Sequence, residues 1–309
     1  MTVEQLLNEF LKSYAPKRLK TNTVRGYRVN IENHLIPFMG QLEVSDISYG
    51  LLDDFCGYMS DKGLSNTTTV YAFAVLRKAI NFAMRRGYMD HNIFHTYDLP
   101  RKEEHEYTIL NPEQCQILLT YLYQKDDDVF LPIYFALRHG LRRGECLGIK
   151  SIDIDARRNE LRICRSIMFD GKNISISNCK TASSRRVLLL DDDDFFWLEQ
   201  YNRSRLSNPN GYLCRDCDGN LVSTNVLQHH FVKALAACGL PRMRFHDLRH
   251  SYATNMMCTD INPKLLSTTL GHSDVKTTLA IYQHSNTAMQ SIINERTRDF
   301  LPRIEKIQC

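Results

Sequence analysis

The sequence predicts a mainly α protein, in which an all-helical first domain is followed by a mixed α/β domain with a small antiparallel three-stranded sheet. Apolar residues recur at helical spacing over most of residues 1–98. Residues 160–190, in contrast, hold short β-branched or alternating runs separated by Gly and Asn. The chain has 309 residues, which is enough for two domains. A proline and mixed charges interrupt the periodicity at residues 99–107, where we place a linker.

The first domain, residues 1–98, is expected to contain helices only. The apolar positions from Val3 to Ala15 fit one helical face. A long helix is expected in SNTTTVYAFAVLRKAINFAMRRGY, which Gly87 closes. Two shorter helices between them, within residues 23–38 and 50–63, complete the domain.

The second domain, residues 108–290, opens with a strong helix start. Asn111, Pro112 and Gln114 have the positions of an N-cap, a first-turn proline and a capping-box partner. A further helix is expected in DVFLPIYFALRHG, and the three strands in ELRICRSIM, NISISNC and RRVLLL. Helices then return, with Gly239 ending one and Pro263 opening another. Residues 291–309 are expected to be a C-terminal tail that docks on a neighbouring subunit.

The composition is that of an ordinary globular protein, with 43% hydrophobic and 24% charged residues. The net charge is 39 − 35, or +4, which is too small by itself to indicate a nucleic-acid partner. No apolar run approaches the roughly 20 residues of a membrane span, and the first residues resemble an amphipathic helix rather than a signal sequence. We therefore expect a soluble cytoplasmic protein whose ten cysteines are reduced thiols.

Two features have some of the character of a metal site, but simpler explanations are favoured. Cys214 and Cys217 in CRDC have metal or redox spacing, yet no second pair completes a four-ligand set, so a plain turn is expected. The aspartates at 191–194 precede FFWLEQY and suit the positive end of a helix dipole. We expect neither a metal nor a cofactor.

Basic residues cluster in the first domain although its total charge is nearly balanced. They lie beside Thr, Asn and Ser groups, a combination that suits a DNA phosphate backbone. A solvated helix face is the alternative explanation. The candidate DNA-binding residues are Lys17, Arg18, Lys20, Arg25, Arg28, Arg77, Lys78, Arg85 and Arg86.

Candidate catalytic residues begin in HGLRRGECLGI. Arg142 follows a glycine-containing helix break, and Glu145, three positions on, can orient its guanidinium from the same helical turn. Lys180, in NCKTASSRR, lies at an expected hairpin, where a mobile ammonium can reach over a cleft. Taken singly, these residues are equally well explained as a buried ion pair and an ordinary turn lysine.

A second group lies in RFHDLRHSYAT. His246 and Arg249 are three residues apart and share a helix face, so an imidazole and a planar cation point to one place, which suits a phosphodiester. The alternative is a zinc helix, because His246 and His250 have the spacing of a zinc protease motif. That motif needs Glu where Asp247 stands, and Arg249 would repel the metal.

The last candidates lie in LGHSDVKTTLAIYQHSN. His272 follows a glycine, and Tyr282 comes ten residues later on an expected helix. Val275, Leu279 and Tyr282 form one stripe at helical spacing, so periodicity alone favours a core tyrosine.

The blocks GLRRGE, KTASSRR, HDLRH and LGHSD, followed by the tyrosine, occur in this order across one domain. Together they resemble the tyrosine recombinase (phage integrase) family. The helical first domain also resembles the SAM-like core-binding domain of that family, so the resemblance covers essentially the whole chain. The ordered set is far more specific than any single block.

The resemblance implies a role for each residue that matches a family position. Arg142 and Arg249 match the two arginines that bind the phosphate, Glu145 the acidic companion of the first, and His246 a proton acceptor. The remaining matches are the hairpin lysine as general acid, a second histidine on the phosphate and the nucleophile, which are Lys180, His272 and Tyr282.

The reaction that the resemblance implies is strand cleavage through a 3′-phosphotyrosyl link that releases a 5′-hydroxyl, followed by resealing without ATP or metal. The implied partners are double-stranded recombination sites, a homo-tetramer on DNA and accessory bending or directionality factors in a prokaryotic cytoplasm. Integration and excision of a mobile element are expected. Chromosome-dimer resolution, DNA inversion, a type IB topoisomerase and a DNA-binding protein without catalysis remain the alternatives.

Overall fold

The computed structural model describes the chain except residues 102–106, 171–172, 179–184, 260, 272–273 and 275–309. The chain divides into two compact units, Met1–His105 and Glu106–Cys309. Each unit has its own hydrophobic core, one built from residues 3–94 and the other from residues 110–248 with a small satellite cluster. None of the helices in the described ranges is long and apolar enough to cross a membrane.

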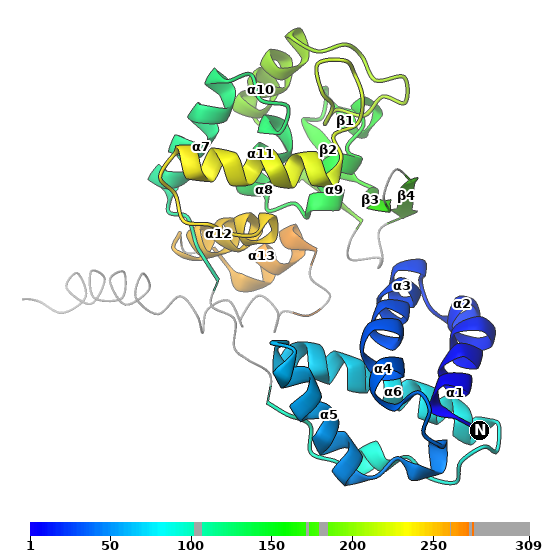
Figure 1. The fold of residues 1–309 in the computed structure, drawn as a ribbon. Coiled ribbons are helices and arrows are strands. Elements are labelled where there is room, and N and C mark those ends of the chain that lie inside the picture. Colours follow the sequence, from blue (N-terminus) through cyan, green and yellow to red (C-terminus); the bar gives the residue numbers. More distant parts are fainter. Residues whose placement is uncertain (102–106, 171–172, 179–184, 260, 272–273, 275–309) are drawn as a thin grey trace, which may run out of the picture. The chain divides into compact units, whose positions relative to one another are not determined.

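The first unit consists of helices joined by short turns, as the sequence predicts (Figure 1). Ser65 caps its longest helix by accepting a hydrogen bond from the backbone N–H of Thr68, and Gly87, at φ +75°, follows the end of that helix. Two short π-helical stretches, Phe10–Tyr14 and Ile31–Leu35, interrupt otherwise continuous helices. The α-helices are α1 (Val3–Glu9), α2 (Ala15–Arg18), α3 (Thr21–Asn30), α4 (Ile36–Met39), α5 (Tyr49–Asp61) and α6 (Asn66–Arg85).

The second unit is helical around two small sheets. Its first helix begins at the predicted capping box, in which Asn111 and Gln114 exchange side-chain and backbone hydrogen bonds. The helices are α7 (Pro112–Gln124), α8 (Phe130–His139), α9 (Arg143–Gly148), α10 (Asp192–Arg203), α11 (Thr224–Ala237), α12 (Phe245–Met257) and α13 (Pro263–Leu270). The strands are β1 (Ile154–Asp155), β2 (Glu160–Ile163), β3 (Arg165–Asp170), β4 (Asn173–Asn178) and β5 (Arg186–Leu189).

An antiparallel three-stranded sheet is present, but its members differ from the predicted ones. The sheet has the order β1-β2-β5, while β3 and β4 form a separate two-stranded ladder. The predicted first strand is divided at Cys164, between β2 and β3. The physical reason is a close approach of β3 to α9, since a Cβ on Gly144 would lie 2.6 Å from the carbonyl oxygen of Ile167.

Helix α8 lies at the centre of the second unit. All of its side chains except that of Arg138 are buried, and α7, α9, α10 and α12 pack against it. A helix that is apolar on every side can be stable only in such a position. The residue that follows α8 therefore lies at the junction of several elements.

Candidate functional site

The candidate site begins at the end of α8, where Gly140 adopts a left-handed conformation at φ +64°. A Cβ at this position would lie 2.5 Å from Cδ1 of Tyr252 and 2.6 Å from Cδ2 of Leu270. Only glycine fits this space and this backbone conformation without strain. Helices α8, α12 and α13 therefore meet at Gly140.

A buried network holds the end of α8 in place. Oδ1 of Asp194 accepts a hydrogen bond from the hydroxyl of Tyr134 at 2.8 Å and contacts Nε2 of His139 at 2.9 Å. Burial opposes ionisation of Asp194, but His139 and the other hydrogen bonds outweigh it and lower the pKa of that carboxyl to about 2. The aspartates at 191–194 thus begin α10, as predicted, and one of them also anchors α8.

Arg142 precedes α9, and hydrogen bonds fix both its backbone and its guanidinium. Its Nη1 donates to Oε1 of Glu145 at 2.8 Å, and its backbone N–H donates to Oε2 at 3.0 Å. Its Nη2 donates to the carbonyl oxygen of Gly271 at 3.0 Å. The predicted orientation of Arg142 by Glu145 is therefore present in the structure.

Arg186 is a member of this cluster that the sequence did not lead us to expect. Its Nη2 lies 3.0 Å from Oε2 of Glu145, and its Nη1 lies 3.4 Å from Oε1. The sequence does hold one signal: Arg186 and Leu188 are two apart in a strand, so they share a face. Because Leu188 is buried, a cation on the same face needs a buried partner.

Glu145 is buried and ionised in this environment. Burial disfavours its charged form, but Arg186 and then Arg142 outweigh this effect and hold the pKa of the carboxyl below its ordinary value. Arg142, Arg186 and Arg249 together with Glu145 carry a net charge of +2. The site therefore retains positive charge that can balance an anion.

Arg249, on α12, is only 2% exposed. Its Nη1 donates to the carbonyl oxygen of Gly140 and its Nη2 to that of Leu270, both at 2.8 Å. Burial and the neighbouring Arg142 lower the pKa of Arg249, while the two carbonyl acceptors favour the charged form. Arg142 and Arg249 are thus attached to adjacent backbone carbonyls, those of Gly271 and Leu270.

His246 lies one turn before Arg249 and is exposed. The atoms around it remove part of its hydration, and Arg249 and Arg142 add positive charge, so its pKa lies below the ordinary value. The His250 ring lies 5.0 Å from that of His246, and the Tyr107 ring lies 4.1 Å from that of His250. A neutral imidazole at position 246 can accept a proton.

The other sequence candidates can be placed only in part. Lys180, His272 and Tyr282 lie outside the described residues. Cys214 is buried and Cys217 exposed, in a turn closed by hydrogen bonds between Asp216 and Asn220. Within the described ranges, no group of three or more His, Cys, Asp or Glu residues could hold a metal ion.

The nine candidate DNA-binding residues of the first unit are all exposed, on or beside α2, α3 and α6. Some stack on aromatic rings, such as Lys78, whose Nζ lies 5.7 Å from the ring centre of Tyr27. These contacts hold the side chains near the surface without removing their charge. These nine residues are Lys17, Arg18, Lys20, Arg25, Arg28, Arg77, Lys78, Arg85 and Arg86.

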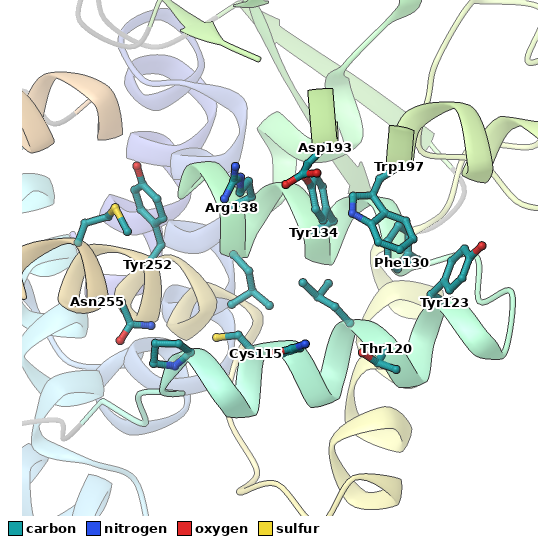
Figure 2. Close-up of a pocket in the computed structure, with 15 residues that line it drawn as sticks. Cys115, Thr120, Tyr123, Phe130, Tyr134, Arg138, Asp193, Trp197, Tyr252 and Asn255 are labelled. Carbon is teal, nitrogen blue, oxygen red and sulfur yellow. The ribbon is translucent and has the colours of Figure 1, made fainter. Parts of the chain in front are cut away.

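A separate groove of about 690 Å³ lies between α7, α8, α10 and α12 of the second unit. Figure 2 shows Phe130 and Tyr134 from α8, Trp197 from α10 and Cys115 from α7 around one hollow. Arg138 and Asp193 supply charges in the lining. The groove is therefore mainly apolar, and it does not include the arginine cluster.

Comparison with known proteins identifies the family. The model of the phage integrase family matches residues 109–289, and that of the phage integrase SAM-like domain matches residues 6–99. The chain belongs to the phage integrase family, and it is a tyrosine site-specific recombinase. The resemblance drawn from the ordered blocks is thereby confirmed.

Among similar curated proteins are an integrase of Mycobacterium phage FRAT1 and the tyrosine recombinase XerC of Roseiflexus sp. (strain RS-1). The first is 23% identical over 301 residues, covering 96% of this chain and 87% of that protein. The second is 24% identical over 295 residues, covering 90% of this chain and 88% of that protein. Both relatives align along nearly the whole of this chain.

Similar solved structures support the fold. The Tn1549 transposon integrase in complex with transposon right end DNA matches with a TM-score of 0.80 at 22% identity, covering 96% of this chain and 99% of that one. A lambda integrase dimer bound to a core site matches with a TM-score of 0.76 at 17% identity, covering 93% of this chain and 97% of that one. The predicted mainly α fold is thereby confirmed.

Proposed function

We propose that this recombinase cleaves DNA with Tyr282 as nucleophile and with Arg142 and Arg249 as the groups that bind the scissile phosphate. One observation carries the assignment: the two guanidiniums, from the N-cap of α9 and from α12, donate to the adjacent carbonyls of Gly271 and Leu270. His272 is the next residue in the sequence. Arginine forks suit the two nonbridging oxygens of a phosphodiester.

The proposed step transfers one phosphoryl linkage from sugar to tyrosine. The phenolic oxygen of Tyr282 forms a bond to phosphorus, its proton passes to His246, and the bond to the 5′ oxygen breaks. Lys180 donates a proton to that leaving oxygen, while His272 hydrogen-bonds the phosphate. The lowered pKa of His246 supports its role, because a neutral imidazole is needed to accept the proton. Positive side chains supply the charge, so the proposal assigns no step to a metal or cofactor.

The proposed partner is double-stranded DNA at a pair of recombination sites. The exposed basic residues on α2, α3 and α6 would contact its phosphates. Similar solved structures include a transposon integrase in complex with transposon DNA and a lambda integrase tetramer bound to a Holliday junction. We extend these partners to the present chain, as a homo-tetramer assisted by bending or directionality factors.

The proposed domain organisation is a core-binding domain at residues 1–98, a linker at 99–107, a catalytic domain at 108–290 and a tail at 291–309. The proposed role is integration and excision of a mobile element in a prokaryotic cytoplasm. Dimer resolution and inversion use the same chemistry, and relatives named XerC and XerD keep them as alternatives. Sequencing the product junctions from separate donor and target DNAs, and from one DNA with two sites, distinguishes these roles.

The test is a suicide substrate, a duplex site with a nick next to the scissile phosphate, so that the covalent intermediate accumulates. We expect the native protein to form a covalent adduct and Tyr282→Phe to form none, because phenylalanine lacks the attacking oxygen. Arg142→Gln, His246→Gln and Arg249→Gln are expected to slow adduct formation by about 10²-fold or more. Gel electrophoresis after denaturation measures the adduct.

The control is Arg203→Gln, which removes one exposed cation on α10 that pairs with Glu199. Its rate of adduct formation should equal that of the native protein. An adduct of undiminished yield with Tyr282→Phe would show that another residue attacks, and the assignment of Tyr282 would be withdrawn.

A further inference from the structure

We propose that Arg186 is a positioning residue for strand cleavage, which holds Glu145 so that Glu145 in turn fixes the guanidinium of Arg142. The inference rests on the proposed role of Arg142 in binding the phosphate. Arg186 itself would not touch DNA. Its contribution would be to keep the first arginine in the orientation that the reaction needs.

The hydrogen bonds of Glu145 form a complete set. Oε1 accepts from Nη1 of Arg142 at 2.8 Å and from Nη1 of Arg186 at 3.4 Å. Oε2 accepts from the backbone N–H of Arg142 and from Nη2 of Arg186, each at 3.0 Å. Each carboxylate oxygen thus bonds to both arginines, which fixes the plane of the carboxylate and, through it, the plane of the Arg142 fork.

Exposure and hydrogen bonding together distinguish Arg142 from Arg186. The side chain of Arg142 is 35% exposed, whereas those of Arg186 and Glu145 are 6% and 4% exposed. The exposed part of Arg142 can therefore meet a ligand, whereas both terminal nitrogens of Arg186 bond to the buried Glu145. Without Arg186, the buried carboxylate would have too little balancing charge, and it would repel the phosphate or turn away from Arg142.

The position of Arg186 in the chain adds a second connection. Arg186 opens β5, where it pairs with Ile163 of β2, and it follows Lys180 by six positions in the sequence. The ion pair with Glu145 thus connects β5, the strand after the lysine segment, to α9, the helix that Arg142 precedes. A defect at Arg186 could act through either neighbour, so the experiment must separate the two routes.

The experiment measures single-turnover cleavage of the suicide substrate by the full-length protein at saturating DNA. Arg186→Gln should slow cleavage by about 10²-fold, the scale of a small misplacement of a catalytic group, with DNA affinity in a gel-shift assay nearly unchanged. Arg186→Lys keeps a positive charge without the fork, so its cleavage rate should lie between those of the native protein and Arg186→Gln. The charge-matched control Arg203→Gln should cleave at the native rate.

A double variant and a modified substrate identify the route. If Arg186 acts through Glu145, Glu145→Gln with Arg186→Gln should be no slower than the slower single variant, because both changes interrupt one chain of contacts. A substrate with sulfur at the 5′ bridging position needs no general acid, since a thiolate leaves without protonation. It should restore cleavage by Lys180→Ala and leave Arg186→Gln slow.

Several results would overturn the inference. They are a native rate with Arg186→Gln, additive losses in the double variant, or restoration of Arg186→Gln by the sulfur substrate, which would place its effect on the lysine segment. If Arg186→Gln does not fold, as judged by circular dichroism and thermal unfolding, Arg186→Lys provides the same comparisons. If the native protein binds the suicide substrate but forms no adduct, the proposed function fails instead, so this result is distinct from a failure of the inference about Arg186.

Discussion

Gly140 has two structural tasks that a larger residue could not combine. It ends α8 in a left-handed conformation, and its carbonyl oxygen accepts one of the two hydrogen bonds that orient the Arg249 guanidinium. The space where a Cβ would lie is filled by Tyr252 and Leu270. A change at Gly140 should therefore affect both folding and the position of Arg249.

Gly140→Ala tests this at the scale of one residue. Left-handed backbone costs an L-residue about 1–2 kcal/mol, and the overlap with Tyr252 and Leu270 should add about 1–3 kcal/mol to the loss of unfolding free energy. Cleavage of the suicide substrate should also slow, because the acceptor of Arg249 shifts. Urea unfolding and single-turnover cleavage measure the two effects.

Gly239→Ala is the matched control, since Gly239 follows α11 of the same unit at φ +65° with nothing within 4 Å of its added Cβ. Its unfolding free energy should fall only by the cost of the left-handed backbone, about 1–2 kcal/mol, and it should cleave at the native rate. Equal losses of unfolding free energy in the two variants would mean that Tyr252 and Leu270 move to accommodate the added methyl group. The close packing around Gly140 would then be unimportant.

At the scale of elements, α2, α3 and α6 present the exposed cations of the first unit. Lys17 and Lys20 lie on either side of the turn between α2 and α3, and both side chains are exposed. Side chains at a helix end can reach a phosphate backbone without moving the helix. The proposed interface with DNA therefore depends on the helices as rigid supports.

Lys17→Gln with Lys20→Gln tests this surface. Removal of one lysine–phosphate interaction should reduce the slope of log affinity against log salt by about 0.9, so the double variant should have a shallower slope by about twice this amount. Lys62→Gln, an exposed lysine outside the cluster, is the control and should keep the native slope. A native slope in the double variant would favour the solvated-face explanation. Gel-shift titrations at several salt concentrations measure the slope.

The elements differ in how far the sequence predicts them. Local signals succeeded: the capping box at Asn111, the glycine at 87 and the proline at 263 each mark a helix boundary in the structure. The sheet membership failed because it depends on the approach of β3 to α9, an interaction between segments about twenty residues apart in the sequence. Strand periodicity carries no information about that approach.

The site shows the same division. Arg142 and Glu145 are three apart in the sequence, so their pairing follows from helix geometry. The pairing of Glu145 with Arg186 crosses from a helix to a strand. The carbonyl acceptors of Gly140, Leu270 and Gly271 have no side-chain signature, so no motif predicts them. Long-range backbone interactions could therefore be seen only in the structure.

At the scale of the whole molecule, the apolar groove between α7, α8, α10 and α12 is a candidate interaction surface. We propose that it receives the C-terminal tail of a second copy of the chain. The tail has the apolar residues Ile292 and Ile293 next to charges of both signs, such as Glu295 and Arg296, which complement Arg138 and Asp193 in the groove. Such an exchange would couple the active sites of neighbouring subunits.

Two changes test this proposal. Deletion of residues 291–309 removes the tail, and Thr120→Arg places a bulky cation in the groove. Each should leave cleavage of a single suicide site intact and reduce the joining of two sites by at least about 10-fold, because only assembly is affected. Gln124→Arg, on the same helix but outside this groove, is the control. Unchanged pairing of sites and unchanged recombination after tail deletion would rule out docking. Recombination of two labelled duplexes provides the measurement.

The attachment of both guanidiniums to backbone oxygens late in the chain also bears on synthesis. A ribosome-bound chain that has emerged only as far as α12 already carries Arg142 and Arg249, but the carbonyls of Leu270 and Gly271 that orient them have not yet appeared. An unfinished polypeptide would thus contain both phosphate-binding arginines but lack the carbonyl groups that orient them. The two arginines can therefore be fully aligned only after residues 270 and 271 have been synthesised.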